Sequence, residues 1–408
     1  MLAQLPNGAA APPPNEARES RDWGLETGGS GKQSPVSTLQ PPIPSRDERL
    51  WIGAVEGMER ALVERAGIPF AGIETGQVRG INPVTALVNG VRMVTGIRQS
   101  LALIKQFQPD VGFVTGGYVC APVVVACRLR NIPVLIYLPD LVPGWAIRTL
   151  SYLAQRVAVT MPAATRYFGG EAPRGKAIVT GYPVRQDLLS ATGGGRLDAA
   201  AHAHNRQEVR RQLAEQLQRP LNEPGDDGAP LPLLLVWGGS QGARNINRCT
   251  WAALEKLLPH VHLLHVVGER DWPLLAAEAP LGQLPAAPRN RYHPVPYLHG
   301  EMALALAAAD LTVARAGAST LGEFTVARLP SVLVPLLGVN QLQNAEALAQ
   351  QGGAVIIADD ALSAQLAETV LALVRDPARR QQMEVALARL AQPEAAQNIA
   401  ATLVRLGQ

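Results

Sequence analysis

Residues 233–247, with the sequence LLLVWGGSQGARNIN, decide the fold class of this chain. A short apolar run passes directly into a loop with three glycines, and residues able to start a helix follow the loop. This order predicts a buried strand whose end presents backbone N–H groups and a helix N-terminus to an anion such as phosphate. The glycine spacing is neither G-x-G-x-x-G nor that of a Walker loop. The motif therefore does not support a dinucleotide site or an ATP-phosphate site. Taken alone, the motif also fits a plain turn between a strand and a helix.

The composition indicates a globular α/β protein of two or three domains. The chain has 408 residues, of which 47% are hydrophobic and 17% charged. A net charge of +3 and an aromatic content of 4% give no support for a nucleic-acid partner. Cys120, Cys127 and Cys249 lie far apart and are interpreted as buried thiols rather than as a disulfide or zinc framework. No apolar run approaches the ~18 residues of a membrane-spanning helix, so we expect a soluble protein or one that sits on a membrane surface.

The organisation of the chain changes near residue 47. Residues 1–46 hold eight of the 33 prolines and have no periodic apolar pattern, so this segment is expected to be disordered or altered. Beyond it, strand-like and helix-like runs alternate, which predicts doubly wound parallel sheets in two domains with a ligand cleft between them. The predicted strands are 50–53, 110–115, 133–137, 156–160, 176–180, 233–237, 262–267, 292–295, 311–314, 331–334 and 354–357.

The same pattern predicts the domain boundaries. We expect an N-terminal domain over residues 47–185, a linker or insertion over 186–230 and a C-terminal domain over 231–390. The last residues, 391–408, are expected to form a helix that returns to the N-terminal domain.

A second group of motifs lies at the ends of later strands. Residues 315–323, RAGASTLGE, follow the predicted strand 311–314, and residues 341–345, QLQNA, follow the next one. In an open parallel sheet these segments lie at the carboxyl ends of strands, where ligands bind. Two helix N-termini and one carboxylate suit a nucleoside diphosphate, because N–H groups hold the phosphates and Glu323 can accept both ribose hydroxyls. Taken alone, Glu323 would be interpreted as a first-turn partner of the helix dipole.

Taken together, five ordered segments resemble the MurG family: 115–119 (TGGYV), 181–185 (GYPVR), 238–243, 315–323 and Gln341-x-x-Asn344. The family comprises bacterial N-acetylglucosaminyltransferases that convert lipid I to lipid II in peptidoglycan synthesis. The resemblance covers about residues 50–405. It implies the GT-B fold, in which two Rossmann-like domains face each other across a cleft. It also implies that GlcNAc passes with inversion from UDP-GlcNAc to the MurNAc 4-hydroxyl of undecaprenyl-pyrophosphoryl-MurNAc-pentapeptide, with no cofactor and no obligatory metal.

The resemblance also implies where the two substrates bind. Ser240 and the amides around it would contact the diphosphate, Tyr297 and Leu298 the uracil, and Gln341 with Asn344 the GlcNAc hydroxyls. The implied donor-site residues are Arg185, Ser240, Gln241, Gly242, Tyr297, Leu298, Ala318, Ser319, Thr320, Leu321, Gly322, Glu323, Gln341 and Asn344. The implied acceptor-site residues are Gly116, Gly117, Tyr118 and Asp140.

The beginning of the chain departs from the family pattern. The family opens with a strand and a G-G-T-G-G-H loop whose histidine is a proposed general base. The nearest counterpart here is 27–33, TGGSGKQ, which no apolar strand precedes. All seven histidines lie at position 202 or later, so no histidine of the N-terminal domain can be that base. We hypothesise a truncated or scrambled 5′ coding region, and sequencing the start of the native transcript would test this.

A second departure lies at residues 137–144, YLPDLVPG, where the family carries H-E-Q-N-A-V-P-G. Asp140 therefore stands where the family has an amide. An acceptor hydroxyl must lose a proton as it attacks the anomeric carbon, so Asp140 is a candidate base. An Asp before a turn is also a common helix cap.

A lipid-linked acceptor in the cytoplasmic leaflet requires contact with the membrane, so a peripheral protein on the cytoplasmic face is expected. Residues 83–107 predict an amphipathic helix that faces either the core or the membrane. Its stripe consists of Leu87, Val91, Val94, Ile97, Leu101 and Ile104, set among Arg92, Arg98 and Lys105. Two other functions stay open: transfer to another lipid acceptor such as diacylglycerol, and non-catalytic binding of a UDP-sugar.

Overall fold

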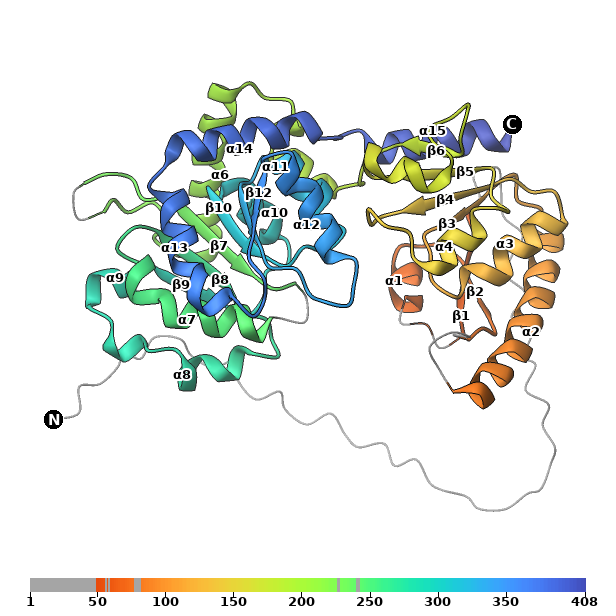
Figure 1. Cartoon of the computed structure of the whole chain (residues 1–408), viewed down its shortest axis with the longest axis horizontal. Coiled ribbons are helices and arrows are strands. Elements are labelled where there is room, and N and C mark those ends of the chain that lie inside the picture. Colours follow the sequence, from red (N-terminus) through yellow and green to blue (C-terminus); the bar gives the residue numbers. More distant parts are fainter. Residues whose placement is uncertain (1–48, 56, 58, 77–81, 226–227, 240–242) are drawn as a thin grey trace, which may run out of the picture. The chain divides into compact units, whose positions relative to one another are not determined.

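The computed structural model describes residues 49–408, except for 56, 58, 77–81, 226–227 and 240–242. Within this part of the chain, helices alternate with strands, and the strands form parallel sheets of two, four and six strands (Figure 1). The α/β class predicted from the sequence is therefore confirmed. The predicted disorder of residues 1–46 concerns residues outside the described part.

The N-terminal half contains the two smaller sheets. In one, β1 (Trp51–Ala54) pairs with β2 (Phe70–Ile73). The other has the order β3 (Gly112–Val114), β4 (Val134–Leu138), β5 (Arg156–Val159) and β6 (Ala177–Val179). The helices of this half are α1 (Arg60–Arg65), α2 (Pro83–Phe107), α3 (Cys120–Leu129), α4 (Trp145–Leu150) and the 3-10 helix η1 (Pro162–Phe168).

The six-stranded sheet of the C-terminal half is doubly wound. Its order is β12 (Ala354–Ile356), β11 (Ser331–Leu333), β10 (Leu311–Ala314), β7 (Leu233–Trp237), β8 (His262–Val266) and β9 (Tyr292–Val295). The chain order reverses at the first strand, β7, which lies between β8 and β10. Ligands of such sheets bind at this switch point, beyond the carboxyl ends of the strands.

The remaining helices follow in chain order. They are α5 (Gln186–Ala191), η2 (Gly193–Gly195), α6 (Ala199–Leu217), α7 (Arg244–Leu257), η3 (Trp272–Leu274), α8 (Leu275–Glu278), η4 (Leu281–Gln283), α9 (Ala286–Asn290), α10 (Glu301–Ala308), α11 (Thr320–Ala327), α12 (Gln341–Gln350), α13 (Leu362–Val374), α14 (Pro377–Leu390) and α15 (Ala395–Gly407). The predicted strands are confirmed to within two residues at each end, whereas β2 was not predicted.

Strand β7 is buried on both faces, which explains why its sequence is a continuous apolar run. Leu233 and Leu235 belong to the core cluster that contains Phe324 of α11. Leu234 belongs to the opposite cluster, with Trp251 of α7. Each fully buried leucine stabilises the fold by roughly 2 kcal/mol through loss of water contact.

The segment 186–230, interpreted from sequence as a linker or insertion, supplies a covering helix. Helix α6 packs along α10, and its Arg206 and Arg210 pair with Asp310 at 3.1 and 3.4 Å. Asp310 immediately precedes β10, and its Oδ2 also accepts a hydrogen bond from the backbone N–H of Leu233 at 2.8 Å. These contacts fasten α6 to the amino ends of two central strands.

The last helix, α15, packs on the four-stranded sheet. Ile399 shares a core cluster with Leu135 and Tyr137 of β4. These two residues alternate with the residues of β4 that face the larger core cluster, so β4 is also buried on both faces. The domain boundaries themselves stay a prediction.

Helix α2 occupies the predicted range, and its apolar stripe is divided. Asn82 caps it by accepting the backbone N–H of Thr85 at 2.8 Å. Ile104 is buried, whereas Val91 and Val94 are exposed to 63% and 51%.

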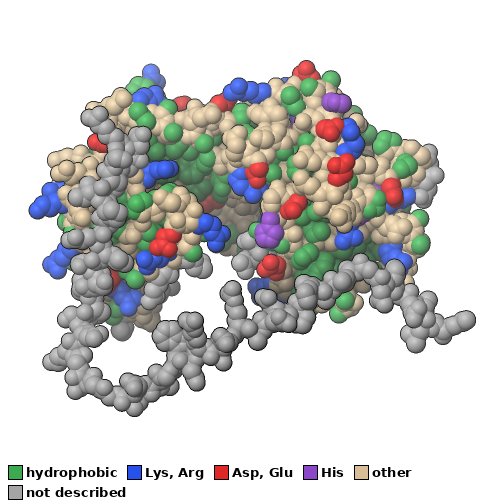
Figure 2. Space-filling view, turned by 180° about the vertical axis from the view of Figure 1, so that it is seen from behind, with side chains coloured by type: hydrophobic (Ala, Val, Ile, Leu, Met, Phe, Trp, Pro, Cys, Tyr) green, Lys and Arg blue, Asp and Glu red, His purple; other side chains and the backbone are tan. Residues whose placement is uncertain are grey.

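None of the helices in the described ranges combines the length and the apolarity needed to cross a membrane. On the face drawn in Figure 2, hydrophobic side chains are interspersed with charged side chains of both signs.

A buried polar chain joins α7, β8 and β9 in the core. Trp251 Nε1 donates to the hydroxyl of Tyr292 at 3.0 Å. His265 Nδ1 lies 2.9 Å from that hydroxyl, and His265 Nε2 lies 3.0 Å from the amide oxygen of Asn247. The nitrogen of the Asn247 amide donates to the Val267 carbonyl, so its oxygen must accept from His265 Nε2. His265 is therefore the neutral Nε2–H tautomer, and Nδ1 accepts from Tyr292. Burial lowers the pKa of His265 to about 3.

This burial predicts a loss of stability in acid. Between pH 6.5 and about 3 the unfolded chain binds a proton at residue 265 that the folded chain does not, so stability falls as pH falls through this window. From about pH 7.5 to about pH 5.5 the loss from His265 alone should be about 1.4 kcal/mol. Urea unfolding at the two pH values should show that His265→Gln loses less stability than the wild type on acidification, by about this amount.

His204→Gln is the matched control, since His204 is exposed on α6. It should lose as much stability on acidification as the wild type. An unchanged pH dependence in His265→Gln would contradict the assignment of a buried neutral ring.

Candidate functional site

The first wall of the candidate site is the junction of β7 with α7. Strand β7 ends at Trp237, Gly239 has a φ of 89° that favours glycine, and Ala243 precedes the first turn of α7. Ser240, Gln241 and Gly242 lie outside the described residues. The N-terminus of the fourteen-residue helix α7 nevertheless lies at the carboxyl edge of the sheet, where its dipole favours an anion.

The second wall is the junction of β10 with α11, which lies next to the first. Ala314 pairs with Trp237, so the segments that follow the two strands leave the same edge of the sheet. Ala318 and Ser319 are half-buried in the connection, and Thr320 and Leu321 are buried in the first turn of α11. The sequence motif 315–323 therefore folds as predicted, into a small-residue turn that opens a helix.

Glu323 has an unsatisfied carboxylate oxygen in this wall. Its Oε2 is buried and has no hydrogen-bond partner in the described part of the chain. Burial raises the pKa of the carboxyl, and a hydrogen bond from Ser319 and the charge of Arg185 oppose that rise. A buried acceptor without a donor is unfavourable, so this oxygen is suited to a ligand hydroxyl.

The segment Gly181–Arg185 runs beside α11. A Cβ on Gly322 would lie 2.7 Å from Tyr182 Cβ and 3.0 Å from the Tyr182 carbonyl oxygen, so the two backbones are in close contact. Arg185 is half-exposed, lies near enough to Glu323 to affect its pKa, and is 3.6 Å from Asp187. Glycine at 322 is thus required by packing rather than by φ.

Tyr297 and Leu298 follow β9 on the other side of β7. Tyr297 is 39% exposed and makes an edge contact with the ring of His299, with centroids 4.7 Å apart, whereas Leu298 is buried. The backbone N–H of Gly268, after β8, donates to the Pro296 carbonyl at 3.0 Å. Tyr297 therefore presents a ring to solvent next to the segment that follows β8.

Gln341 and Asn344 open helix α12, and both make hydrogen bonds within the protein. Gln341 Oε1 accepts the backbone N–H of Leu336 at 2.9 Å. Asn344 is fully buried; its Nδ2 donates to Asp140 Oδ1 at 3.0 Å and to the Ala316 carbonyl at 3.2 Å. Its Oδ1 accepts the N–H of Leu141 at 3.0 Å.

The residues predicted to bind an acceptor lie at the ends of β3 and β4. Gly116 and Gly117 have φ values of 113° and 85°, which favour glycine, and Tyr118 is 47% exposed. Asp140 is half-buried just beyond β4. Because β3 and β4 are adjacent and parallel, both segments leave one edge of the four-stranded sheet.

Some residues that shape the site were not predicted from the sequence. Asp359, after β12, accepts from Arg315 Nη1 at 2.5 Å and from Asn245 Nδ2 at 3.0 Å. Asp271, after β8, accepts from Arg244 at 3.2 Å and from Asn247 at 3.0 Å. Asp359 follows the apolar run 354–357 by two residues, and this position could have marked it as a candidate at the carboxyl end of a strand. Nothing in the sequence indicated its partners.

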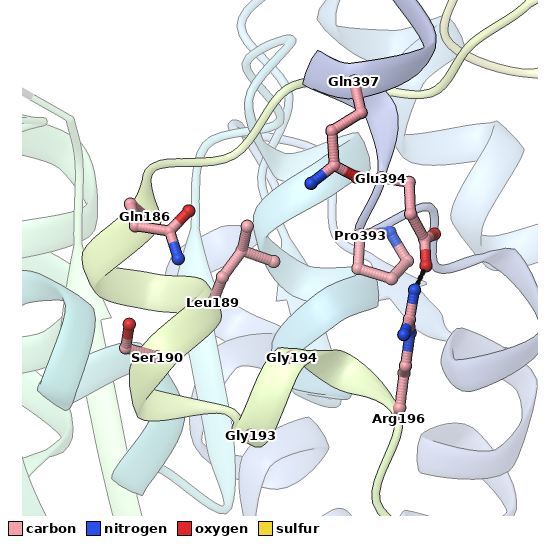
Figure 3. Close-up of a pocket in the computed structure, with 9 residues that line it drawn as sticks. All are labelled: Gln186, Leu189, Ser190, Gly193, Gly194, Arg196, Pro393, Glu394 and Gln397. Carbon is pink, nitrogen blue, oxygen red and sulfur yellow. Dashed lines mark ion pairs between the residues drawn. The ribbon is translucent and has the colours of Figure 1, made fainter.

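A separate pocket of about 440 Å³ lies outside these walls (Figure 3). It is lined by α5 and η2 on one side and by residues 393–397 on the other, and Arg196 pairs with Glu394 at its edge. None of the residues predicted to bind a substrate lines it.

Comparisons with known proteins give a consistent result. Residues 31–159 match the Glycosyltransferase family 28 N-terminal domain, and residues 233–399 match the Glycosyltransferase family 28 C-terminal domain. The first match begins before Leu50, where the resemblance was expected to begin.

Individual relatives are similar over most of their length. The UDP-N-acetylglucosamine--N-acetylmuramyl-(pentapeptide) pyrophosphoryl-undecaprenol N-acetylglucosamine transferase of Roseiflexus sp. (strain RS-1) is 37% identical, over 83% of this chain and 79% of the relative. The protein of the same name from Desulforudis audaxviator is 37% identical, over 82% and 83%.

Solved structures agree with this result. The crystal structure of Acinetobacter baumannii MurG matches with a TM-score of 0.64 and 25% identity, over 88% of this chain and 91% of that one. The UDP-GlcNAc 2-epimerase of Neisseria meningitidis matches with a TM-score of 0.59 at 12% identity, a likeness in fold alone. The predicted GT-B fold is thereby confirmed.

The close contact at Gly322 predicts a difference between two glycines of one motif. In Gly322→Ala the new methyl group meets Cβ and the carbonyl oxygen of Tyr182, and neither atom moves when the tyrosine side chain rotates. We therefore expect a net loss of about 1–2 kcal/mol of stability despite the better helix propensity of alanine. Gly317→Ala is the control, since a Cβ built there has no described atom within 4 Å. Denaturant unfolding should place Gly317→Ala within about 0.5 kcal/mol of the wild type. Equal stability of the two variants would contradict the packing argument.

Proposed function

The chain belongs to the MurG family of glycosyltransferases, and from this premise we propose that it transfers GlcNAc from UDP-GlcNAc to the MurNAc 4-hydroxyl of undecaprenyl-pyrophosphoryl-MurNAc-pentapeptide. The product is the lipid-linked disaccharide of peptidoglycan synthesis. The observation that carries the proposal lies at the switch point of the six-stranded sheet. Two helix N-termini converge there with the Glu323 oxygen that has no partner in the described ranges of the chain.

The donor half of the proposal follows from this arrangement. The diphosphate lies across the N-terminus of α7 and the turn before α11, where backbone N–H groups and helix dipoles attract it. Glu323 accepts the ribose hydroxyls with the oxygen that has no donor among the described residues. The exposed ring of Tyr297 packs on the uracil and Leu298 contacts it, while Gln341 and Asn344 hold the sugar.

The acceptor half is assigned to the loops after β3 and β4. The backbone of Gly116 and Gly117 approaches the acceptor's diphosphate closely because no side chain intervenes. Asp140 is the proposed base. It removes the proton from the 4-hydroxyl as that oxygen attacks the anomeric carbon from the face opposite UDP, so the configuration inverts. UDP leaves with its charge stabilised by the loop amides and helix dipoles.

Membrane contact is assigned to the exposed part of α2. Val88, Val91 and Val94 are each about half or more exposed, and Arg92 and Arg98 on the same helix are exposed as well. An apolar strip with neighbouring cations suits an anionic lipid surface. We propose peripheral binding at the cytoplasmic face of the membrane, where the acceptor lies.

A transfer assay with the full chain tests the function. With UDP-GlcNAc and a lipid I analogue, we expect UDP release matched by formation of the lipid-linked disaccharide. Turnover with diacylglycerol and not with the lipid I analogue would assign a different acceptor. Binding of UDP-GlcNAc without turnover of either acceptor would assign a non-catalytic binder.

Asp140→Asn tests the base. The asparagine keeps an oxygen that can accept the Asn344 amide, so the local geometry is retained while the basicity is lost. We expect kcat to fall by about 100-fold or more while the KM for UDP-GlcNAc changes by less than about threefold. Asp110→Asn, at an exposed position before β3, is the control and should keep wild-type kinetics. Wild-type kcat in Asp140→Asn would remove Asp140 from the mechanism.

Vesicle sedimentation tests the membrane surface. We expect the double variant Val91→Glu, Val94→Glu to bind vesicles containing anionic lipid at least about tenfold more weakly, because it removes apolar contact and adds repulsion. Its affinity for UDP should not change. Val404→Glu, on the exposed side of α15, is the matched control and should bind as the wild type does. Equal binding by all three proteins would place the membrane contact elsewhere.

A further inference from the structure

Arg244, the first residue of α7, is held by a buried carboxylate. Its Nε and Nη2 both lie 3.2 Å from Oδ1 of Asp271. The Asp271 side chain is only 3% exposed, whereas that of Arg244 is 49% exposed. One edge of the guanidinium is therefore fixed inside the protein, and the rest of the side chain reaches the surface.

Asp271 is itself fixed from behind by the polar chain of the core. Its Oδ2 accepts from Asn247 Nδ2 at 3.0 Å, and the Asn247 oxygen accepts from His265. The chain of donors thus runs in one direction, from Trp251 through Tyr292, His265 and Asn247 to Asp271. Hydrogen bonds aligned in this way reinforce one another in a buried environment.

The position of Arg244 relates this chain to the donor site. Arg244 follows the glycine loop after β7, and Asp271 lies in the segment after the adjacent strand β8. The N–H of Gly268 in that segment donates to Pro296, the residue before Tyr297. In the sheet order β10, β7, β8, β9, Arg244 therefore lies between the turn after β10, which is assigned to the diphosphate, and the segment after β9, which is assigned to the uracil.

We propose that Arg244 binds the diphosphate of the donor nucleotide and that Asp271 is the positioning residue that holds its guanidinium ready. The inference rests on the proposed function, because it names a further contact to the same donor. A fixed guanidinium loses little side-chain freedom when a phosphate binds. The charge of Asp271 does not repel the phosphate strongly, because the guanidinium lies between them and the carboxylate is already hydrogen-bonded on both oxygens.

Calorimetric titration of the full chain with uridine and with UDP separates this role from a structural one, because only UDP carries the diphosphate. In Arg244→Gln we expect the affinity for UDP to fall by about tenfold and the affinity for uridine to change by less than about twofold. Arg248→Gln is the matched control. Arg248 lies one turn further along α7, pairs with Glu278 at 2.7 Å and is assigned no role in binding. It should bind both ligands as the wild type does.

Asp271→Asn tests the positioning role. The amide removes the charge that holds the guanidinium, so UDP affinity should fall by several-fold with uridine affinity retained. The double variant Arg244→Gln, Asp271→Asn should lose little more than Arg244→Gln alone, because both changes act through one guanidinium. Additive losses in this cycle would overturn the positioning role.

The outcomes also distinguish this inference from the proposed function. Wild-type transfer activity together with unchanged UDP affinity in Arg244→Gln would overturn the inference alone. Parallel losses for UDP and uridine in Arg244→Gln would assign Arg244 a structural role and overturn it as well. A wild-type chain that binds neither uridine nor UDP would overturn the donor site and the inference with it.

Discussion

The parallel pairing of β7 with β10 determines where the two nucleotide-facing helices begin. Leu311 pairs with Leu234 and Ala314 with Trp237, so both strands end at the same level. Both are buried on their two faces, and a shift of register by one residue would turn each leucine of β7 toward the opposite helix layer. The packing of the core thus holds the N-termini of α7 and α11 beside each other. Electrostatic attraction for a diphosphate at this edge is a consequence of hydrophobic burial below it.

The first turn of α7 is then fixed from two sides by carboxylates. Asp271, on the segment after β8, accepts from Arg244, and Asp359, on the segment after β12, accepts from Asn245 and Arg315. Each carboxylate is paired with a cation and with an amide, which compensates for removing its charge from water.

The sequence predicted the repeating features of this fold and few of its long-range contacts. Apolar runs and small-residue turns predicted the strands and the junctions of β7 and β10 with their helices, because both depend on neighbouring residues. Strand β2 was not predicted, since Ala71 and Gly72 interrupt its apolar pattern. The Arg244–Asp271 pair and the contact between Asn344 and Asp140 join residues 27 and 204 positions apart, and no local pattern indicates such pairings. The resemblance to the family indicated that Asn344 and Asp140 matter without indicating that they touch.

The contact between Asn344 and Asp140 has a consequence for how donor and acceptor would be coupled. The Asn344 amide donates both of its N–H groups and accepts one, so only one lone pair of its oxygen is left for a sugar hydroxyl. A donor sugar that accepts a hydrogen bond from an Asn344 N–H must displace either Asp140 or the Ala316 carbonyl from that N–H. Because an amide bound to a carboxylate is held more strongly than one bound to a neutral oxygen, exchange with Ala316 is the less costly of the two. Asn344 would then donate one N–H to the donor sugar and the other to Asp140, the proposed base. The sugar that is transferred and the group that deprotonates the acceptor hydroxyl would thus be joined by hydrogen bonds through one amide.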